Sequence, residues 1–112
     1  MEKVLNIGGK EVKMKSTASI LTIYRNNFGR DFMTDIIKMQ QSLATVEKGK
    51  ELEVLDLDFF EKVAWCMAKA GDSETPELEK WLDEFELFDL LQALPEIMAL
   101  ITANMEQINK KK

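Results

Sequence analysis

Hydrophobic and polar residues alternate over the first 15 positions, the period expected of a β-strand. Two such runs, VLNI and KEVKMK, are separated by Gly8 and Gly9. A Gly-Gly pair tolerates the positive φ angles of a tight hairpin turn. A phosphate-binding loop would need a following helix start with a Lys-Ser or Lys-Thr pair, and none follows. The pattern therefore predicts a β-hairpin over residues 3–15.

From Ser16 the hydrophobic period becomes that of a helix. Ile20, Tyr24 and Phe28 are four residues apart, a Ser or Thr is available as the N-cap, and Gly29 can end the helix in a left-handed conformation. We expect a helix over about residues 17–28.

The next helix is expected to start directly after this corner, over residues 31–48. Asp31 places a carboxylate at its start, where the helix dipole favours it, and Gly49 lies near its end. Its apolar residues are spaced four, three, four and three, the seam of a helix packed on another helix. They are Phe32, Ile36, Met39, Leu43 and Val46.

Two further helices are predicted from their caps. Asp58 with Glu61 three residues later has the form of a capping box, and the helix that follows, over residues 58–70, contains Trp65. Thr75 before Pro76 combines a cap with the residue best tolerated at the first helical position. The next helix is therefore expected over residues 76–86, with Trp81 in its apolar stripe.

The last helix is expected over residues 88–109. Its apolar seam is spaced three, four, three, four and three, and Pro95 inside it predicts a kink or a break into two helices. The seam comprises Leu91, Leu94, Met98, Ile101, Met105 and Ile108.

Together these patterns predict a mainly α protein, with a short N-terminal β-hairpin followed by about five helices in a compact bundle. The length of 112 residues suits a single domain over residues 1–112. We assign structural roles in turns, corners and core to a set of ten residues. They are Gly8, Gly9, Tyr24, Phe28, Gly29, Asp31, Phe32, Trp65, Trp81 and Pro95.

Composition narrows the setting of the protein. Apolar residues make up 46% and charged residues 31%, a globular balance, and no apolar run approaches the ~18 residues that would cross a bilayer. The start of the chain does not resemble a signal peptide. Cys66 is the only cysteine, so no internal disulfide can form, and its apolar neighbours predict a buried thiol. These features favour a cytoplasmic protein without a membrane partner.

The residue types needed for common catalytic sites are scarce. Histidine is absent, which removes the usual zinc sites and every Ser-His or Cys-His arrangement. The carboxylates of residues 72–89 interleave with an apolar stripe, as on a solvated helix face. The lysines near the hairpin flank it and do not cluster as a nucleic-acid patch would. We expect no enzymatic activity, no cofactor, no metal and no nucleic-acid partner.

Charge is distributed unevenly along the chain. Residues 1–50 contain nine Lys or Arg and five acids, a balance of +4, whereas residues 51–112 contain six and fifteen, a balance of −9. Such poles would allow subunits to stack head to tail.

Seven methionines add a second hint of partner binding, because Met fills both cores and adaptable interfaces. The last helix is long for so small a domain, so its distal part could remain uncovered. Its candidate partner-binding residues are Met98, Ile101, Met105 and Ile108, although a core role fits the methionines too.

The order of these features resembles a known family. IGGKEVKMK, YRNNFGRDF, VAWCMAKA, PELEKWLDEFE and LLQALPEIMAL follow one another as in the tail assembly chaperones of long-tailed (siphovirus-type) phages and prophages of Gram-positive bacteria. The resemblance covers nearly the whole chain and rests on order and interval, since each motif alone is common.

The resemblance implies a non-enzymatic role in assembling the phage tail. Such chaperones bind the long helical tape measure protein and keep it soluble while the tail tube protein polymerises around it. It further implies a homo-oligomer, possibly spiral, in the host cytoplasm and not in the mature virion. Relatives of this kind are often made in two lengths by ribosomal frameshifting. The terminal Asn-Lys-Lys-Lys fits either a slippery A-rich run or a basic end that complements the helix dipole.

One alternative of another class stays open. Residues 72–89 contain eight acids and only Lys80 as a cation, a balance of −7. A small acidic inhibitor or adaptor that docks on a basic partner would use such a face.

Overall fold

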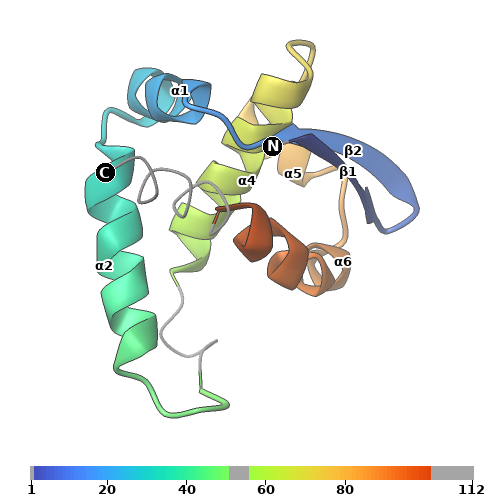
Figure 1. Cartoon of the computed structure of the whole chain (residues 1–112). Helices are drawn as coiled ribbons and strands as arrows, with labels where there is room; N and C mark the ends of the chain where they lie inside the picture. Colours follow the sequence, from blue (N-terminus) through green and yellow to red (C-terminus); the bar gives the residue numbers. More distant parts are fainter. Residues whose placement is uncertain (1, 51–55, 102–112) are drawn as a thin grey trace.

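The computed structural model describes residues 2–50 and 56–101, apart from the side chain of Leu43. An antiparallel hairpin of β1 (Glu2–Ile7) and β2 (Lys10–Lys15) precedes α1 (Ser19–Phe28), α2 (Phe32–Ala44), α4 (Leu57–Gly71), α5 (Leu78–Leu82) and α6 (Leu87–Gln92) (Figure 1). Residues 94–101 are also helical. The expectation of a mostly helical protein with an N-terminal hairpin is confirmed.

The hairpin closes as its sequence predicts. Gly8 and Gly9 have φ angles of 62° and 88°, and the N–H of Gly9 donates to the side-chain oxygen of Asn6 at 2.8 Å. The strands pair with Leu5 opposite Val12, so that alternate residues point into the core. The positive φ angles explain why glycine occupies both turn positions.

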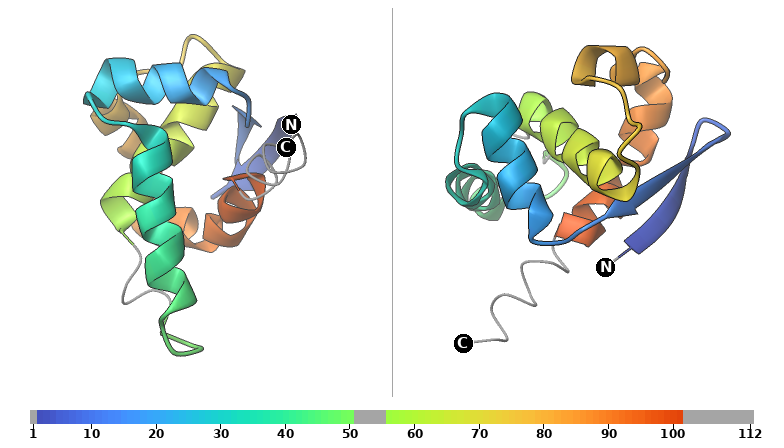
Figure 2. Two further views of the ribbon diagram at one scale, coloured as in Figure 1. Left: turned by 60° about the vertical axis from the view of Figure 1, so that its left-hand side comes forward. Right: turned by 90° about the horizontal axis from the view of Figure 1, so that it is seen from above.

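Helix α4 forms the centre of the molecule. It contacts β2, α1 and α5, and Figure 2 shows these elements arranged around it. Every residue from Val63 to Ala68 is buried, as are Phe59 and Phe60. A helix that is apolar on nearly all sides is covered on all sides. One hydrophobic cluster therefore joins the hairpin and the helices.

The corner between α1 and α2 has the two capping residues that the sequence predicted. Gly29, at φ 66°, caps α1, and its N–H donates to the carbonyl of Arg25 at 2.8 Å. Asp31 caps α2 by accepting from the N–H of Met33 and from the hydroxyl of Thr34. Both residues were assigned correctly because capping depends on neighbours in sequence.

Three other predicted helix starts are wrong. The N-cap of α1 is Ala18, without a side-chain hydrogen bond, and α4 begins after Asp56, whose carboxylate accepts from the N–H of Phe59 at 3.1 Å. The hydroxyl of Thr75 donates to the carbonyls of Ala68 and Asp72, and so ties the loop to the end of α4 instead of capping α5. Helix α5 consequently starts only at Leu78.

Glu61 illustrates why the predicted capping box fails. An early start of α4 places Glu61 in the second turn of the helix, where its side chain is half-buried. Burial, with a smaller contribution from Asp58, raises the pKa of Glu61. Asp58 pairs instead with Lys62 at 2.9 Å.

The last predicted helix is two helices within the described residues. Helix α6 ends at Gln92, and residues 94–101 form a second helical stretch whose first turn contains Pro95. Proline is tolerated in a first turn because its missing N–H would have no partner there. The break expected from Pro95 is present, and the helix count rises accordingly.

The buried face of this region differs from the predicted seam. Leu90, Ala93, Ile97 and Leu100 are buried, whereas Leu91, Leu94 and Met98 of the predicted seam are half-buried. Ile101 is the one described residue of that seam that is buried as predicted. The hydroxyl of Ser16 donates to the carbonyl of Leu100 at 3.0 Å and fixes the second stretch to the end of the hairpin. Residues 102–109 of the predicted helix lie outside the described residues.

The remaining helix lengths were overestimated. Helix α2 ends at Ala44, before the predicted end at 48, and α5 ends at Leu82, before the predicted end at 86.

No helix in the described ranges is both long enough and apolar enough to cross a membrane.

Candidate functional site

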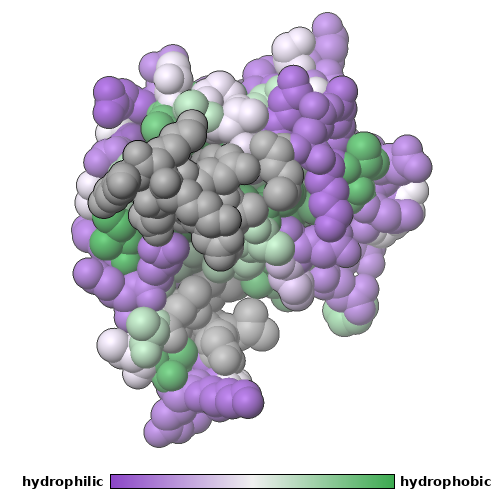
Figure 3. Space-filling view, viewed as in Figure 1, coloured by the Kyte–Doolittle hydropathy of each residue, from purple (hydrophilic) through white to green (hydrophobic). Residues whose placement is uncertain are grey.

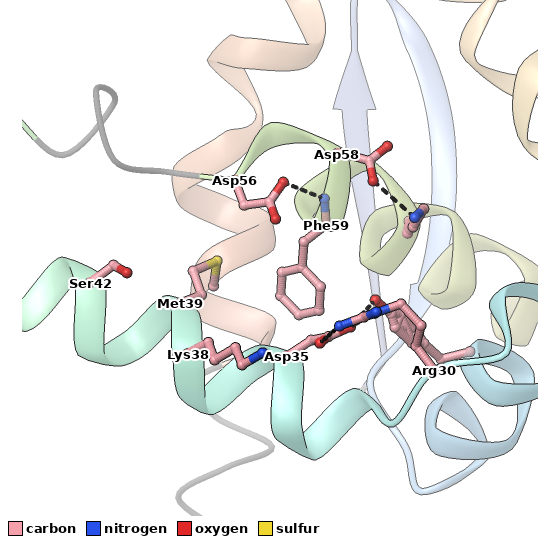
Figure 4. A pocket seen from close by; sticks show the side chains of 10 residues that line it. Arg30, Asp35, Lys38, Met39, Ser42, Asp56, Asp58 and Phe59 are labelled. Atoms are coloured by element: carbon pink, nitrogen blue, oxygen red, sulfur yellow. Dashed lines mark hydrogen bonds and ion pairs between the residues drawn. The ribbon is translucent and has the colours of Figure 1, made fainter.

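A cavity lies between α2 and the first turns of α4 (Figure 4). It encloses about 400 Å³ and has charged groups on both walls. Arg30 and Asp35 approach from one side, Asp56 and Asp58 from the other, and the ring of Phe59 points into the space between them. The remaining lining residues are Tyr24, Lys38, Met39, Ser42 and Lys62.

Asp35 is the centre of the first wall. The guanidinium of Arg30 donates to both of its carboxylate oxygens at 2.8 Å, and the hydroxyl of Tyr24 donates to one of them at 2.7 Å. The Asp35 side chain is 10% exposed, against 53% for Arg30. These hydrogen bonds, first from Arg30 and then from Tyr24, lower the pKa of Asp35 to about 2.

The partners of Asp35 are affected in the opposite direction. Burial, followed by the bond to Asp35, raises the pKa of Tyr24, and the bonds to Asp35 raise the pKa of Arg30. All three groups therefore keep one protonation state across the physiological range. The side chain of Lys38 extends toward this cluster in Figure 4.

The opposite wall is also paired internally. Asp58 binds Lys62, and Asp56 is occupied as the cap of α4. The cavity thus holds three cations and three carboxylates, most of them already neutralised by one another. These polar bonds stay within each wall, and the two walls are joined by ring contacts of Tyr24 and Phe32 with Phe59. We therefore assign the cavity a structural role.

Metal-binding groups do not converge in the part of the chain that the structure describes. No three His, Cys, Asp or Glu side chains lie close enough there to share a metal ion. Cys66 is buried in α4 as predicted, and burial raises the pKa of its thiol to about 12.

The predicted partner-binding residues are not brought together on a described surface. Met98 is half-buried and packs against the core, and Ile101 is 4% exposed. Met105 and Ile108 lie outside the described residues. By contrast, four residues that were predicted to be structural lie in the core: Tyr24, Phe32, Trp65 and Trp81 are all buried.

The first turn of α6 contains an exposed apolar pair that was not predicted from the sequence. Leu87 is 66% exposed and Phe88 is 67% exposed, next to half-buried Leu91. We call these three residues the α6 patch. The available signal was two large apolar residues in succession between the charged residues Glu86 and Asp89. Other exposed apolar side chains are scattered, and the face in Figure 3 is mostly hydrophilic with separate small apolar areas.

The basic N-terminal half and the acidic C-terminal half of the chain contact each other within one molecule. Lys10 of the hairpin forms an ion pair with Glu84, and its ammonium group lies 5.7 Å from the centre of the Phe85 ring. Lys13 pairs with Glu2 across the strands at 3.0 Å. Part of the charge asymmetry is therefore neutralised internally.

Comparisons of the whole chain with protein-family models, with curated proteins and with solved structures gave no significant match.

Proposed function

We propose that this protein is a tail assembly chaperone of a long-tailed phage or prophage, which binds the helical tape measure protein without enzymatic action. The observation that carries the proposal is the order of hairpin, YRNNFGRDF corner, aromatic helix, acidic loop and final LLQALPEIMAL over nearly the whole chain. The hairpin and the Gly29 corner, on which the resemblance partly rests, are formed as the sequence predicted.

The α6 patch is the described surface best suited to such a client. Two large apolar side chains that stay two-thirds exposed at a helix start lose contact with water when an apolar helix packs on them. Burying each side chain contributes on the order of 1 to 2 kcal/mol, which suits a contact that must later be released. Many weak contacts along a long client would add through avidity.

The proposal has further parts. The chaperone works as a spiral homo-oligomer in the host cytoplasm, assists the tail tube protein and is absent from the mature virion. A heterologous contact that does not close produces such a spiral. The uneven charge of the two halves of the chain is compatible with that contact.

Co-expression tests the proposal directly. The tape measure protein is produced alone, with this chain, and with Leu87→Thr/Phe88→Thr, and its soluble fraction is measured. The wild-type chain is expected to keep the client soluble, whereas the double variant loses most of this effect. Because both side chains are exposed, the variant's own stability should change by less than about 0.5 kcal/mol per site.

A matched control changes exposed apolar residues elsewhere. Val4→Thr/Ile37→Thr alters side chains that are 55% and 44% exposed and should still protect the client. Aggregation of the client beside folded wild-type chain would refute the function. Equal protection by both double variants would refute only the α6 patch as the binding surface.

The acidic adaptor remains the second candidate. Residues 72–89 provide seven acids besides Glu84, which Lys10 already engages, so a basic partner would find most of the face available. Such binding would be dominated by charge, and its salt dependence separates it from the chaperone.

A further inference from the structure

A second hollow lies away from the charged cavity, where the end of α1, the middle of α4 and the start of α5 meet. It encloses about 420 Å³ and is lined by Asn27, Phe28, Trp65, Glu77, Leu78 and Glu79. We call it the α1–α5 groove. None of its residues belongs to the α6 patch, so its role is separate from the proposed client contact. Glu77, Leu78 and Glu79 do lie within residues 72–89, the face of the acidic adaptor, for which the groove would give a specific binding place.

The floor of the groove is aromatic and already fixed in place. The rings of Phe28 and Trp65 pack edge to face, with their centres 5.7 Å apart. The indole N–H of Trp65 donates to the carbonyl of Pro76 at 2.7 Å, so the polar atom of this side chain is satisfied within the protein. The side-chain amide of Asn27 likewise donates to the carbonyl of Ile23. A ligand in the groove therefore meets the exposed part of the half-buried Phe28 ring, with the Trp65 ring, 4% exposed, behind it.

The rim of the groove is acidic. Glu77 and Glu79 are exposed, and neither is within ion-pair distance of a Lys or Arg in the described part of the chain. Lys62 does approach from the α4 side, where its ammonium group lies 5.3 Å from the centre of the Phe28 ring, but Asp58 neutralises it. Phe28 thus already accepts one cation on its ring, and the two free carboxylates favour another.

We propose that the α1–α5 groove binds a short basic amphipathic segment of a partner protein. An apolar side chain of the segment would pack on Phe28, Trp65 and Leu78, and neighbouring Lys or Arg would pair with Glu77 and Glu79. The volume admits a few side chains and no more. The acidic rim disfavours a nucleic acid.

A second copy of this chain is a poorer occupant. Two of the four lysines in its hairpin, Lys10 and Lys13, are engaged by Glu84 and Glu2 of their own chain. Their binding in the groove would break these pairs, which leaves Lys3 and Lys15 for such a contact. A foreign segment can present several lysines on one face without breaking any ion pair.

The test uses a fluorescent synthetic helical peptide of Leu and Lys, about 14 residues long so that it can form a helix. A peptide of the same length with Glu in place of Lys is the charge control. The full-length protein is titrated against each by fluorescence anisotropy in low salt. We expect saturable binding of the Lys peptide only.

Variants locate the binding. Glu77→Gln/Glu79→Gln should weaken binding of the Lys peptide about fivefold or more, because two surface ion pairs are lost. Glu74→Gln/Glu86→Gln removes the same charge from the same acidic segment outside the groove and should change the affinity less than twofold. All four positions are exposed, so both double variants should fold.

NMR supplies an independent readout, because the chain has only two indole N–H groups. The Trp65 signal should shift with the Lys peptide, whereas that of Trp81 should not. An absence of binding, equal losses in the two double variants, or equal binding of the Glu peptide would each overturn the proposal. So would self-association of the protein that Glu77→Gln/Glu79→Gln abolishes, because the occupant would then be a second copy.

Discussion

Asp35 is the side chain through which the α1–α2 corner is tied together by charge. Its pKa in the folded state, about 2, is lower than the value near 4 that an unfolded aspartate has. The folded state therefore gains stability above about pH 4 and loses it as the pH falls toward 2. Asp35→Asn should cost about 2 kcal/mol at neutral pH, because Arg30 and Tyr24 lose a charged acceptor. It should also flatten the acid limb of the stability profile.

Urea unfolding followed by circular dichroism at several pH values between 2 and 7 checks this expectation. Tyr24→Phe is the matched control, since it removes one hydrogen bond, costs about 1 kcal/mol and leaves the Arg30 pair intact. Its profile should keep most of the acid limb of the wild type, because the Arg30 pair, the largest cause of the lowered pKa of Asp35, is still present. An Asp35→Asn profile parallel to the wild type would show that other carboxylates cause the acid sensitivity.

The same corner shows which residue roles can be read from sequence. Asp31 and Gly29 were assigned correctly, because a cap bonds to groups within three or four residues. The partner of Arg30 could not be named, because Asp35 is five residues away and on the following helix. Both residues follow Gly29, and they meet because the Arg30 side chain, just before α2, lies against Asp35 in the first turn of that helix. A hydrophobic pattern does not specify that side-chain placement.

Gly71 permits the closest contact between two elements of the fold. A Cβ atom added there would collide with the backbone carbonyl of Lys13 in β2, and would crowd the Cα of Met14 at 3.3 Å. Both are backbone atoms and cannot rotate away, so β2 would have to separate from the end of α4. Gly71→Ala should therefore destabilise the protein by about 1 to 3 kcal/mol.

The sign of the change in the free energy of unfolding caused by Gly71→Ala tests whether β2 packs closely on Gly71. At an open helical position the same substitution stabilises by about 0.5 to 1 kcal/mol, because alanine is the better helix former. Thermal and urea unfolding of Gly71→Ala against wild type measure the difference. A more stable variant would mean that β2 does not rest on Gly71.

The last helical region shows where prediction of elements from sequence reaches its limit. The segment LLQALPEIMAL contains two apolar stripes one residue apart, and each has helical spacing. The predicted stripe contains Leu91 and Leu94, whereas the protein buries Leu90, Ala93 and Ile97. Periodicity identifies a helix in such a segment but cannot say which stripe faces the core. The packing surfaces of β1 and α4 decide that, and they come from distant parts of the sequence.

Over the whole molecule, the sequence predicted fold class better than binding surfaces. The hairpin and the positions of most helices depend on local pattern, and they were largely found. The α6 patch and the α1–α5 groove depend on what remains uncovered after the elements pack. Phe28, Trp65 and Leu78, for example, are distant in sequence and meet only through the packing of α1, α4 and α5. No local signal could have placed them together.

Salt dependence distinguishes the chaperone from the acidic adaptor. Contacts at the α6 patch are apolar, so retention of the tape measure protein should change less than about twofold when NaCl is raised from about 0.05 M to about 0.5 M. An adaptor that docks residues 72–89 on a basic partner should lose most of its affinity over this range, because exposed charges are screened. A pull-down at both NaCl concentrations measures how much tape measure protein is retained. Binding of the Lys peptide at the α1–α5 groove serves as a salt-sensitive internal standard. If the higher NaCl concentration weakens binding of the tape measure protein as much as binding of the Lys peptide, the result favours the adaptor. Charge would then dominate both contacts.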